Sequence, residues 1–137
     1  MRTIALISCG KSKLGRSAPA CRLYTGALFQ KSLAYARHIN ADAIYILSAN
    51  YGLLELAQEV TPYEKTLNGM ASSDVERWAE TVLEQLRSRT DLTTDRFVIL
   101  AGMAYRSRLV PHLANVELPL DGLRFGEQLK FLKSANA

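Results

Sequence analysis

The fold of this chain is decided by Ile4-Ala5-Leu6-Ile7-Ser8-Cys9-Gly10-Lys11-Ser12-Lys13, an apolar run that leads directly into a polar loop. Four apolar residues without alternation are typical of a strand that is buried on both faces of a parallel sheet. Gly10 then permits a tight turn at the end of that strand. The run predicts a central strand whose carboxyl end carries backbone N–H groups and two lysines, which is where α/β proteins usually keep their sites.

Two more apolar runs end in the same manner. Ala43–Leu47 leads into Ser48-Ala49-Asn50-Tyr51-Gly52, and Phe97–Leu100 leads into Ala101-Gly102-Met103-Ala104-Tyr105. Because the carboxyl ends of parallel strands meet at one edge of a sheet, the three runs predict one shared cleft.

Helical periodicity alternates with these strands. Residues 26–39 place apolar side chains at helical spacing before the second strand. Ser73-Asp74-Val75-Glu76 has the pattern of a capping box, and six apolar residues then form one stripe that ends near Arg87 and Arg89. The stripe consists of Val75, Trp78, Ala79, Val82, Leu83 and Leu86. We predict a short helix from about Ala104 that is interrupted near Pro111, and a last helix over Gly126–Lys133 that turns Leu129 and Leu132 to the core.

The segment from Asn50 to Met70 is predicted to be irregular, because it is polar and broken by proline and glycine. With 137 residues, of which 48% are hydrophobic, the chain is long enough for one core and shows no linker. We therefore predict a single α/β domain over residues 1–137, with three layers and a mostly parallel central sheet flanked by helices.

Composition narrows the possible partners and compartments. The net charge of +4 mildly favours an anionic partner. No apolar run has the length needed to cross a bilayer, and no signal-peptide pattern is found, so we expect a cytoplasmic protein without a membrane partner. Cys9 and Cys21 are expected to be reduced, and as metal ligands they would need two more partners. His38 and His112 lack ligand spacing, so neither a metal nor a cofactor is predicted.

Four motifs together carry a resemblance to a known group of proteins. They are Ser8-Cys9-Gly10-Lys11-Ser12-Lys13, Leu23-Tyr24-Thr25-Gly26, Ile46-Leu47-Ser48-Ala49-Asn50-Tyr51-Gly52-Leu53-Leu54 and Pro62-Tyr63-Glu64-Lys65-Thr66-Leu67, with a weaker echo in Pro119–Gly126. In order and spacing they resemble a small bacterial and phage domain family of uncharacterised function. That family is similar to the YaaA proteins and, more distantly, to the core domain of archaeosine synthase. The resemblance implies DNA binding from YaaA, base-modification chemistry from archaeosine synthase, and a possible base glycosylase activity for the small domains.

The loop after the first strand has two interpretations. Lys11 and Lys13 are either solvated charges or, with the N–H groups around Ser8 and Gly10, a cradle for phosphate. The Walker pattern of nucleotide-binding loops is absent. Cys9 is either a nucleophile or a small residue packed at the end of the strand.

The residues after the second strand are the next candidates. Asn50 is either a turn residue in a left-handed conformation or an amide that reads a base edge or orients water. Ser48, Tyr51 and Gly52 flank it. Core packing explains some of the tyrosines near this cleft, but flat side chains are also what an extruded base stacks upon. These tyrosines are Tyr24, Tyr51, Tyr63 and Tyr105, and Lys65 adds a further cation for a phosphate.

Hydrolysis of an N-glycosidic bond passes through a cationic sugar, which calls for a carboxylate or an amide near the reacting carbon. Asn50 is our candidate for the contact to water or base, and Asp121 or Glu64 for the acidic partner. A lysine that attacks the sugar to form a Schiff base is the other route, with Lys11 or Lys13 as the candidate.

The preferred hypothesis is a cofactor-independent DNA glycosylase that releases a modified or damaged base, such as 5-hydroxymethyluracil. Two alternatives remain open: a non-catalytic DNA-binding stress protein like YaaA, and an enzyme that processes nucleotides or nucleosides. The expected partner is DNA or a modified nucleobase or nucleotide, and no oligomeric state is predicted.

Overall fold

A computed structural model describes residues 1–137, and its centre is a five-stranded sheet in the order β4-β3-β1-β6-β7. The central strand β1 (Thr3–Ser8) runs parallel to β3 (Ala43–Ser48) on one side and to β6 (Arg96–Leu100) on the other. β7 (Asn115–Glu117) continues the parallel arrangement beyond β6, and β4 (Gly52–Glu55) pairs antiparallel with β3 at the opposite edge. The three predicted strands and the mostly parallel sheet are confirmed.

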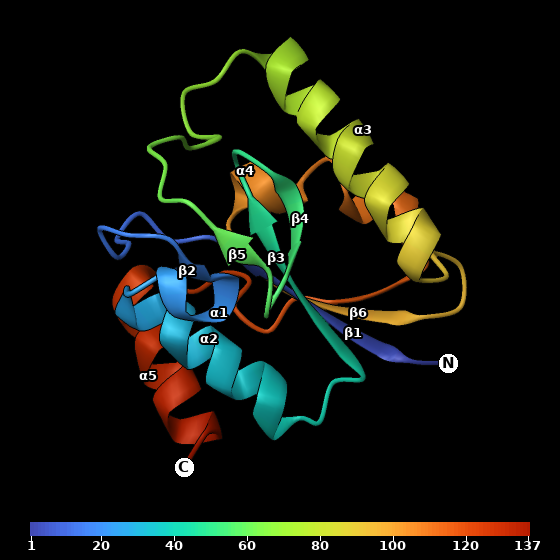
Figure 1. The fold of residues 1–137 in the computed structure, drawn as a ribbon. Helices are drawn as coiled ribbons and strands as arrows, with labels where there is room; N and C mark the ends of the chain where they lie inside the picture. The colour runs from blue at the N-terminus through green and yellow to red at the C-terminus, as the bar shows by residue number, and fades with distance from the viewer.

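Helices cover both faces of this sheet (Figure 1). They are α1 (Ala20–Leu23), α2 (Ala27–His38), α3 (Ser72–Arg89), α4 (Met103–Arg106), the 3₁₀ helix η1 (Val110–His112) and α5 (Phe125–Ala135). α2 and α5 lie side by side on one face, and α3 lies on the other. The predicted three-layer α/β domain is therefore confirmed. None of the helices has the length and hydropathy of a membrane span.

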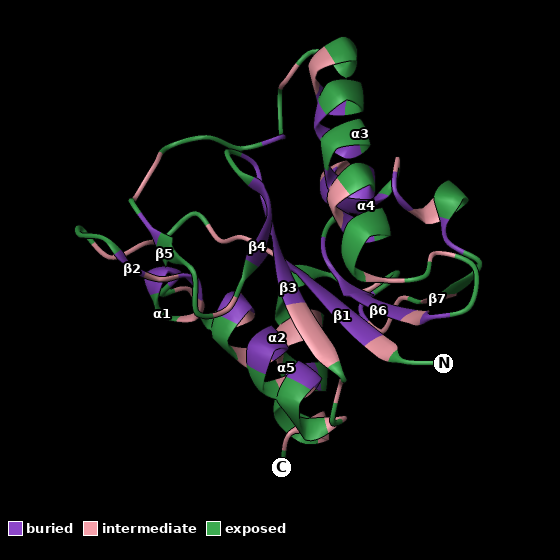
Figure 2. Ribbon diagram, turned by 45° about the vertical axis from the view of Figure 1, so that its right-hand side comes forward, coloured by how far each residue is buried: buried purple, intermediate pink, exposed green.

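The lack of alternation in β1 follows from these layers. Ile4 and Leu6 belong to the core beneath α3, whereas Ala5 and Ile7 belong to the core beneath α2 and α5. All four side chains are at most 1% exposed, and Figure 2 shows the buried colour running through the middle of the sheet. Both faces of the strand must therefore be apolar, which is the pattern that the sequence displays.

The two long helices lie close to the predicted positions. α2 begins directly after Gly26 and ends at His38, and every residue of the α3 stripe is buried. The predicted capping box is wrong, because the N-cap of α3 is Ala71 and no side chain caps the helix. Asp74 instead forms an ion pair with Arg77 on the next turn.

The prediction of an irregular segment from Asn50 to Met70 is only partly correct. β3 returns through a tight turn into β4, with Ser48 paired to Gly52. Further on, β5 (Glu59–Val60) pairs antiparallel with β2 (Ala18–Pro19). These strands are too short to show a periodicity of their own, and it is pairing with distant residues that makes them strands. Residues 61–70 are irregular as predicted.

The carboxyl-terminal part also follows the prediction in outline. α4 and η1 occupy the region around Ala104 to Pro111, and Pro111 lies within the first turn of η1, where a missing N–H costs nothing. In α5, Leu132 is fully buried and Leu129 is half-buried.

Candidate functional site

The carboxyl ends of β1, β3 and β6 lie together at one edge of the sheet, and two separate cavities flank the end of β1. Ser8 lines the first cavity, and its neighbour Cys9 lines the second. The single cleft expected from the sequence is thus divided by the end of the central strand.

The larger cavity has a volume of about 580 Å³, and we call it the lysine cavity. Its lining comes from the loop after β1 and from the segment after β5, and consists of Cys9, Gly10, Lys11, Lys13, Glu64, Lys65, Thr66 and Asn68. Three ammonium groups and one carboxylate give this cavity a net positive charge. The side chain of Glu64 forms no ion pair or hydrogen bond and is exposed. The structure therefore places a free carboxylate among three cations.

Lys13 is held in place within this cavity. Its backbone forms an isolated bridge with Tyr24, and its ammonium group donates a hydrogen bond to the carbonyl of Lys11 at 3.2 Å. The Nζ atom also lies 4.6 Å from the ring centroid of Tyr63, a distance at which a cation interacts with an aromatic face. Lys13 is thus a positioned charge, whereas the side chain of Lys11 is exposed and forms no contact of its own.

Behind Lys13 runs a chain of three hydroxyl groups. Ser48 Oγ accepts the backbone N–H groups of Asn50 and Tyr51 at 3.2 and 3.1 Å and donates to Tyr63 Oη at 2.7 Å. Tyr63 Oη and Tyr24 Oη lie 2.6 Å apart, and one of the two hydroxyl groups donates to the other. Tyr24 and Tyr63 each carry one phenol proton, and the hydrogen bond between them uses only one of the two. The other proton has no acceptor within the protein. One hydroxyl group of this hydrogen-bonded series is therefore free to donate a further hydrogen bond.

Cys9 connects this region to Tyr105. Its Sγ atom donates to Tyr105 Oη at 3.6 Å, and the same oxygen accepts the N–H of Leu67 at 3.4 Å. Tyr105 thereby ties the segment after β5 to the end of β1. The thiol is free, half-buried and part of the wall of the lysine cavity.

The tyrosines differ sharply in exposure. Tyr24 is fully buried and Tyr105 is 8% exposed, so neither ring offers a face on which a base could stack. For these two residues the expectation of a stacking surface is wrong. Tyr51, at 42% exposed, packs edge-on against Tyr63 and is the open aromatic ring of the group.

Burial also changes the titration of the phenols. It raises the pKa of Tyr24 to about 12, and it raises the pKa of Tyr63 and of Tyr105 as well. All three hydroxyl groups are therefore protonated, and able to donate, throughout the neutral range.

We expect the free energy of unfolding to fall as the pH rises from about 10 to about 12. Above pH 10 the unfolded chain loses tyrosine protons that the folded chain keeps, so stability declines by about 1.4 kcal/mol per pH unit for each such group. Urea unfolding at about pH 9 and about pH 11 measures the slope. Tyr24→Phe is expected to make it shallower, and the exposed Tyr51→Phe is the control. An equal slope in all three proteins would contradict the prediction.

Asn50 lies in the turn between β3 and β4, outside both cavities. Its side chain is exposed and forms no hydrogen bond. Of the two interpretations of Asn50, the turn residue is correct in position but not in conformation, because the positive φ in this turn, +74°, belongs to Gly52. Asn50 therefore contacts the site only through its backbone N–H, which donates to Ser48 Oγ, and its side-chain amide is exposed to solvent.

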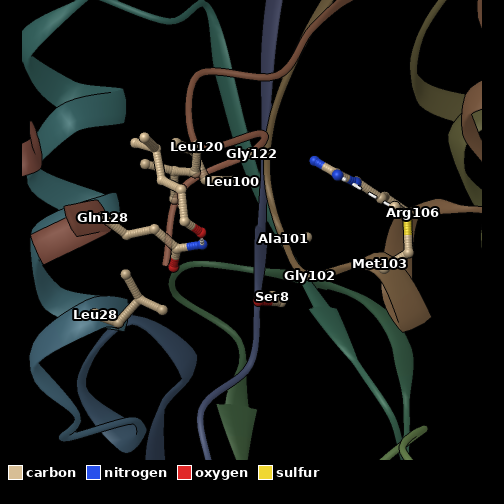
Figure 3. A pocket seen from close by; sticks show the side chains of 11 residues that line it. Ser8, Leu28, Leu100, Ala101, Gly102, Met103, Arg106, Leu120, Gly122 and Gln128 are labelled. Carbon is tan, nitrogen blue, oxygen red and sulfur yellow. Dashed lines mark hydrogen bonds between the residues drawn. The ribbon is translucent and has the colours of Figure 1, made fainter. Parts of the chain in front are cut away.

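The smaller cavity, which we call the Arg106 cavity, has a volume of about 170 Å³ (Figure 3). It is lined by Ser8, Leu28, Leu100, Ala101, Gly102, Met103, Arg106, Leu120, Gly122, Leu123 and Gln128. Asp121 stands at its edge, where it accepts a hydrogen bond from Arg106 at 2.7 Å. The two carboxylates proposed from the sequence are thus separated: Glu64 lies in the lysine cavity, and Asp121 pairs with Arg106.

Sequence reasoning did not single out four polar residues of these cavities. Thr66 and Asn68 line the lysine cavity, and Arg106 and Gln128 line the other. Arg106 follows the end of β6 on α4, so its position after a buried strand was a usable signal. Gln128 reaches its cavity only because α5 packs beside α2, which no local pattern shows.

Comparison of the chain with known proteins identifies a family but no activity. No curated protein matches the chain. The model of a family described as a family of unknown function, DUF6884, matches residues 4–134. This match runs from the first strand into the last helix. Because it spans nearly the whole chain, the protein belongs to the DUF6884 family.

Proposed function

We propose that this protein is a cofactor-independent, glycosylase-like enzyme that hydrolyses the N-glycosidic bond of a modified or damaged base in DNA. The observation that carries the proposal is the lysine cavity, in which a free carboxylate stands among three lysines at the carboxyl end of a parallel strand. A volume of about 580 Å³ lies in the usual range for small-molecule sites. The resemblance to YaaA proteins and archaeosine synthase points to the same substrate class.

The cations suit the phosphates of the substrate. Lys13 is fixed by its contacts to Lys11 and Tyr63, so it offers a charge at a defined place. Lys11 and Lys65 are exposed and free to meet phosphates on either side of the target nucleotide. Such contacts orient a nucleic acid without reading its sequence.

Glu64 suits the sugar. As the bond between C1′ and the base nitrogen breaks, positive charge develops on the sugar, and a nearby carboxylate stabilises it. Glu64 then accepts a proton from the attacking water, whose oxygen bonds to C1′. The base takes the bonding electron pair and gains a proton from solvent, and Glu64 releases to solvent the proton that it took from the water, so the products are a free base and an abasic sugar.

The experiment is an incubation of the purified protein with oligonucleotides that carry uracil, 5-hydroxymethyluracil, 8-oxoguanine or deazaguanine. Alkali cleavage scores abasic sites, and cleavage at one modified base is the expected result. Borohydride trapping distinguishes hydrolysis from the lysine route, because only a Schiff base leaves the protein bound to the DNA. No cleavage of any oligonucleotide, with binding retained, would overturn the proposal in favour of a non-catalytic DNA-binding protein.

We expect the double variant Lys11→Ala/Lys13→Ala to bind oligonucleotides more weakly and with less dependence on salt. Losing two phosphate contacts reduces the slope of log K against log salt by about 1.4 for single strands and about 1.8 for duplex DNA. Fluorescence anisotropy over a salt series measures the slope. Lys130→Ala/Lys133→Ala, two exposed lysines of α5, is the charge-matched control. Equal slopes in the two variants would rule out a phosphate cradle.

A further inference from the structure

We propose that the Arg106 cavity binds a single nucleobase, which accepts a hydrogen bond from Arg106 and donates one to Gln128. The ligand class rests on the proposed function, since this base would belong to the nucleotide held by the lysine cavity. The position, size and polar groups of the cavity are independent observations.

Arg106 supplies donors that the protein does not use. Its side chain is only 10% exposed, and its hydrogen bonds to Asp121 and to the Met103 sulfur both leave from Nη2. Nε and Nη1 have no partner within the protein, and neither is sealed from open space. Because both groups can be reached from open space, a ligand oxygen beside Arg106 would have two free N–H groups to accept from.

The charge of the cavity favours a neutral ligand. Asp121 stands 2.7 Å from Arg106 and balances its positive charge. No other charged residue lines the cavity. A phosphate would therefore find more favourable charge in the lysine cavity, with its three ammonium groups, than here.

Gln128 faces Arg106 from the other side. In Figure 3 the Arg106 side chain extends from α4 toward the loop that carries Leu120 and Gly122, and the Gln128 side chain extends from α5. Gln128 donates from Nε2 to the carbonyl of Leu123 at 3.0 Å, which leaves its Oε1 as an acceptor. A donor and an acceptor of the protein can pair with a base edge that carries an acceptor beside a donor, such as a carbonyl beside a ring N–H in uracil or N7 beside the amino group in adenine.

Size and walls fit a flat ring. A volume of about 170 Å³ equals on the order of six water molecules, which is room for one pyrimidine and not for a nucleotide. Leu28, Leu100, Leu120 and Leu123 form apolar walls for its faces.

The two cavities adjoin along the chain. Ser8 lines one and Cys9 the other, and consecutive Cα atoms are about 3.8 Å apart. A base on the Ser8 side and its phosphates on the Cys9 side would place the glycosidic bond across the end of β1, which is where Glu64 and water must act.

Titration of the ¹⁵N-labelled protein with free uracil, 5-hydroxymethyluracil, cytosine and adenine tests this without any cleavage. Uracil and 5-hydroxymethyluracil are expected to shift the amide signals of Gly102, Gly122 and the Gln128 side chain. Deoxyribose 5-phosphate, which carries no base, is expected to leave these three signals unchanged. Shifts elsewhere, no shifts from any of the bases, or equal shifts from deoxyribose 5-phosphate would overturn the proposal.

The variant Gln128→Leu keeps the size of the side chain and removes its amide. It is expected to weaken the binding of the free bases at least tenfold, because the acceptor of the cavity is lost. Gln58→Leu, at an exposed glutamine outside both cavities, is the control. If oligonucleotides are cleaved but the bases do not bind here, the base pocket is wrong and the glycosylase stands. If the bases bind here but nothing is cleaved, the pocket stands and the glycosylase is wrong.

Discussion

Glu64→Gln is expected to lower the rate of base release by a factor of about 100 to 10,000 while oligonucleotide binding stays intact or tightens slightly. The substitution keeps the shape of the side chain but removes the charge that stabilises the cationic sugar and the base that accepts the proton of water. It also removes the negative charge from a cavity that otherwise holds three lysines, so phosphate binding should not suffer. Single-turnover rates on the cleaved oligonucleotide, together with anisotropy, separate the two effects.

Two other carboxylates serve as controls for Glu64. Glu59 is exposed on β5, outside the cavity, and Glu59→Gln should leave the rate unchanged. Asp121→Asn weakens the ion pair that holds Arg106 in place, so its effect should fall on base binding more than on the chemical step. A full rate with Glu64→Gln and a collapsed rate with Asp121→Asn would move the chemistry to the Arg106 cavity and contradict the assignment.

Much of the fold could be predicted because a strand that is buried on both faces of the sheet has a recognisable apolar sequence. β1 is apolar at four consecutive positions since each face packs against a helical layer. α3 is buried on one side only, and its sequence accordingly has one apolar stripe on an otherwise polar helix. Both patterns involve residues that are close together in the sequence, and both elements lie close to their predicted positions.

The errors arise where distant partners decide the structure. β4 and β5 are strands because β3 and β2 lie beside them, and their own residues carry little preference. The capping box failed because α3 begins earlier, at Ser72, so Ser73 lies inside the helix.

The candidate site shows the same limit. Asp121 and Glu64 look alike in the sequence, each a carboxylate inside a motif. Only the folded chain shows that one faces Arg106 and the other faces lysines. Which tyrosines are buried could not be predicted from the sequence either, because their burial depends on how the segment after β5 packs over the end of β1.

Gly52→Ala is expected to lower the free energy of unfolding by about 2 to 5 kcal/mol. Gly52 has φ of +74°, a conformation that costs an alanine about 1 to 2 kcal/mol. Its new Cβ would also lie 2.6 Å from Gln85 Oε1, the atom that accepts the N–H of Leu53 at 2.8 Å. Gln85 must move away, which leaves that N–H unpaired at a further cost of about 1 to 3 kcal/mol. Urea unfolding of the variant measures the sum.

Gly69→Ala separates the two contributions. Gly69 also has a positive φ, of +83°, but a Cβ there would meet no atom within 4 Å, so only the conformational cost applies. Gln85→Ala should lose the bond to Leu53 without the strain. The double variant Gly52→Ala/Gln85→Ala should then be less destabilised than the sum of its parts, because the collision and the lost bond are counted once. Equal losses for Gly52→Ala and Gly69→Ala would show that Gln85 yields at no cost, and strict additivity in the double variant would show that the two residues act independently.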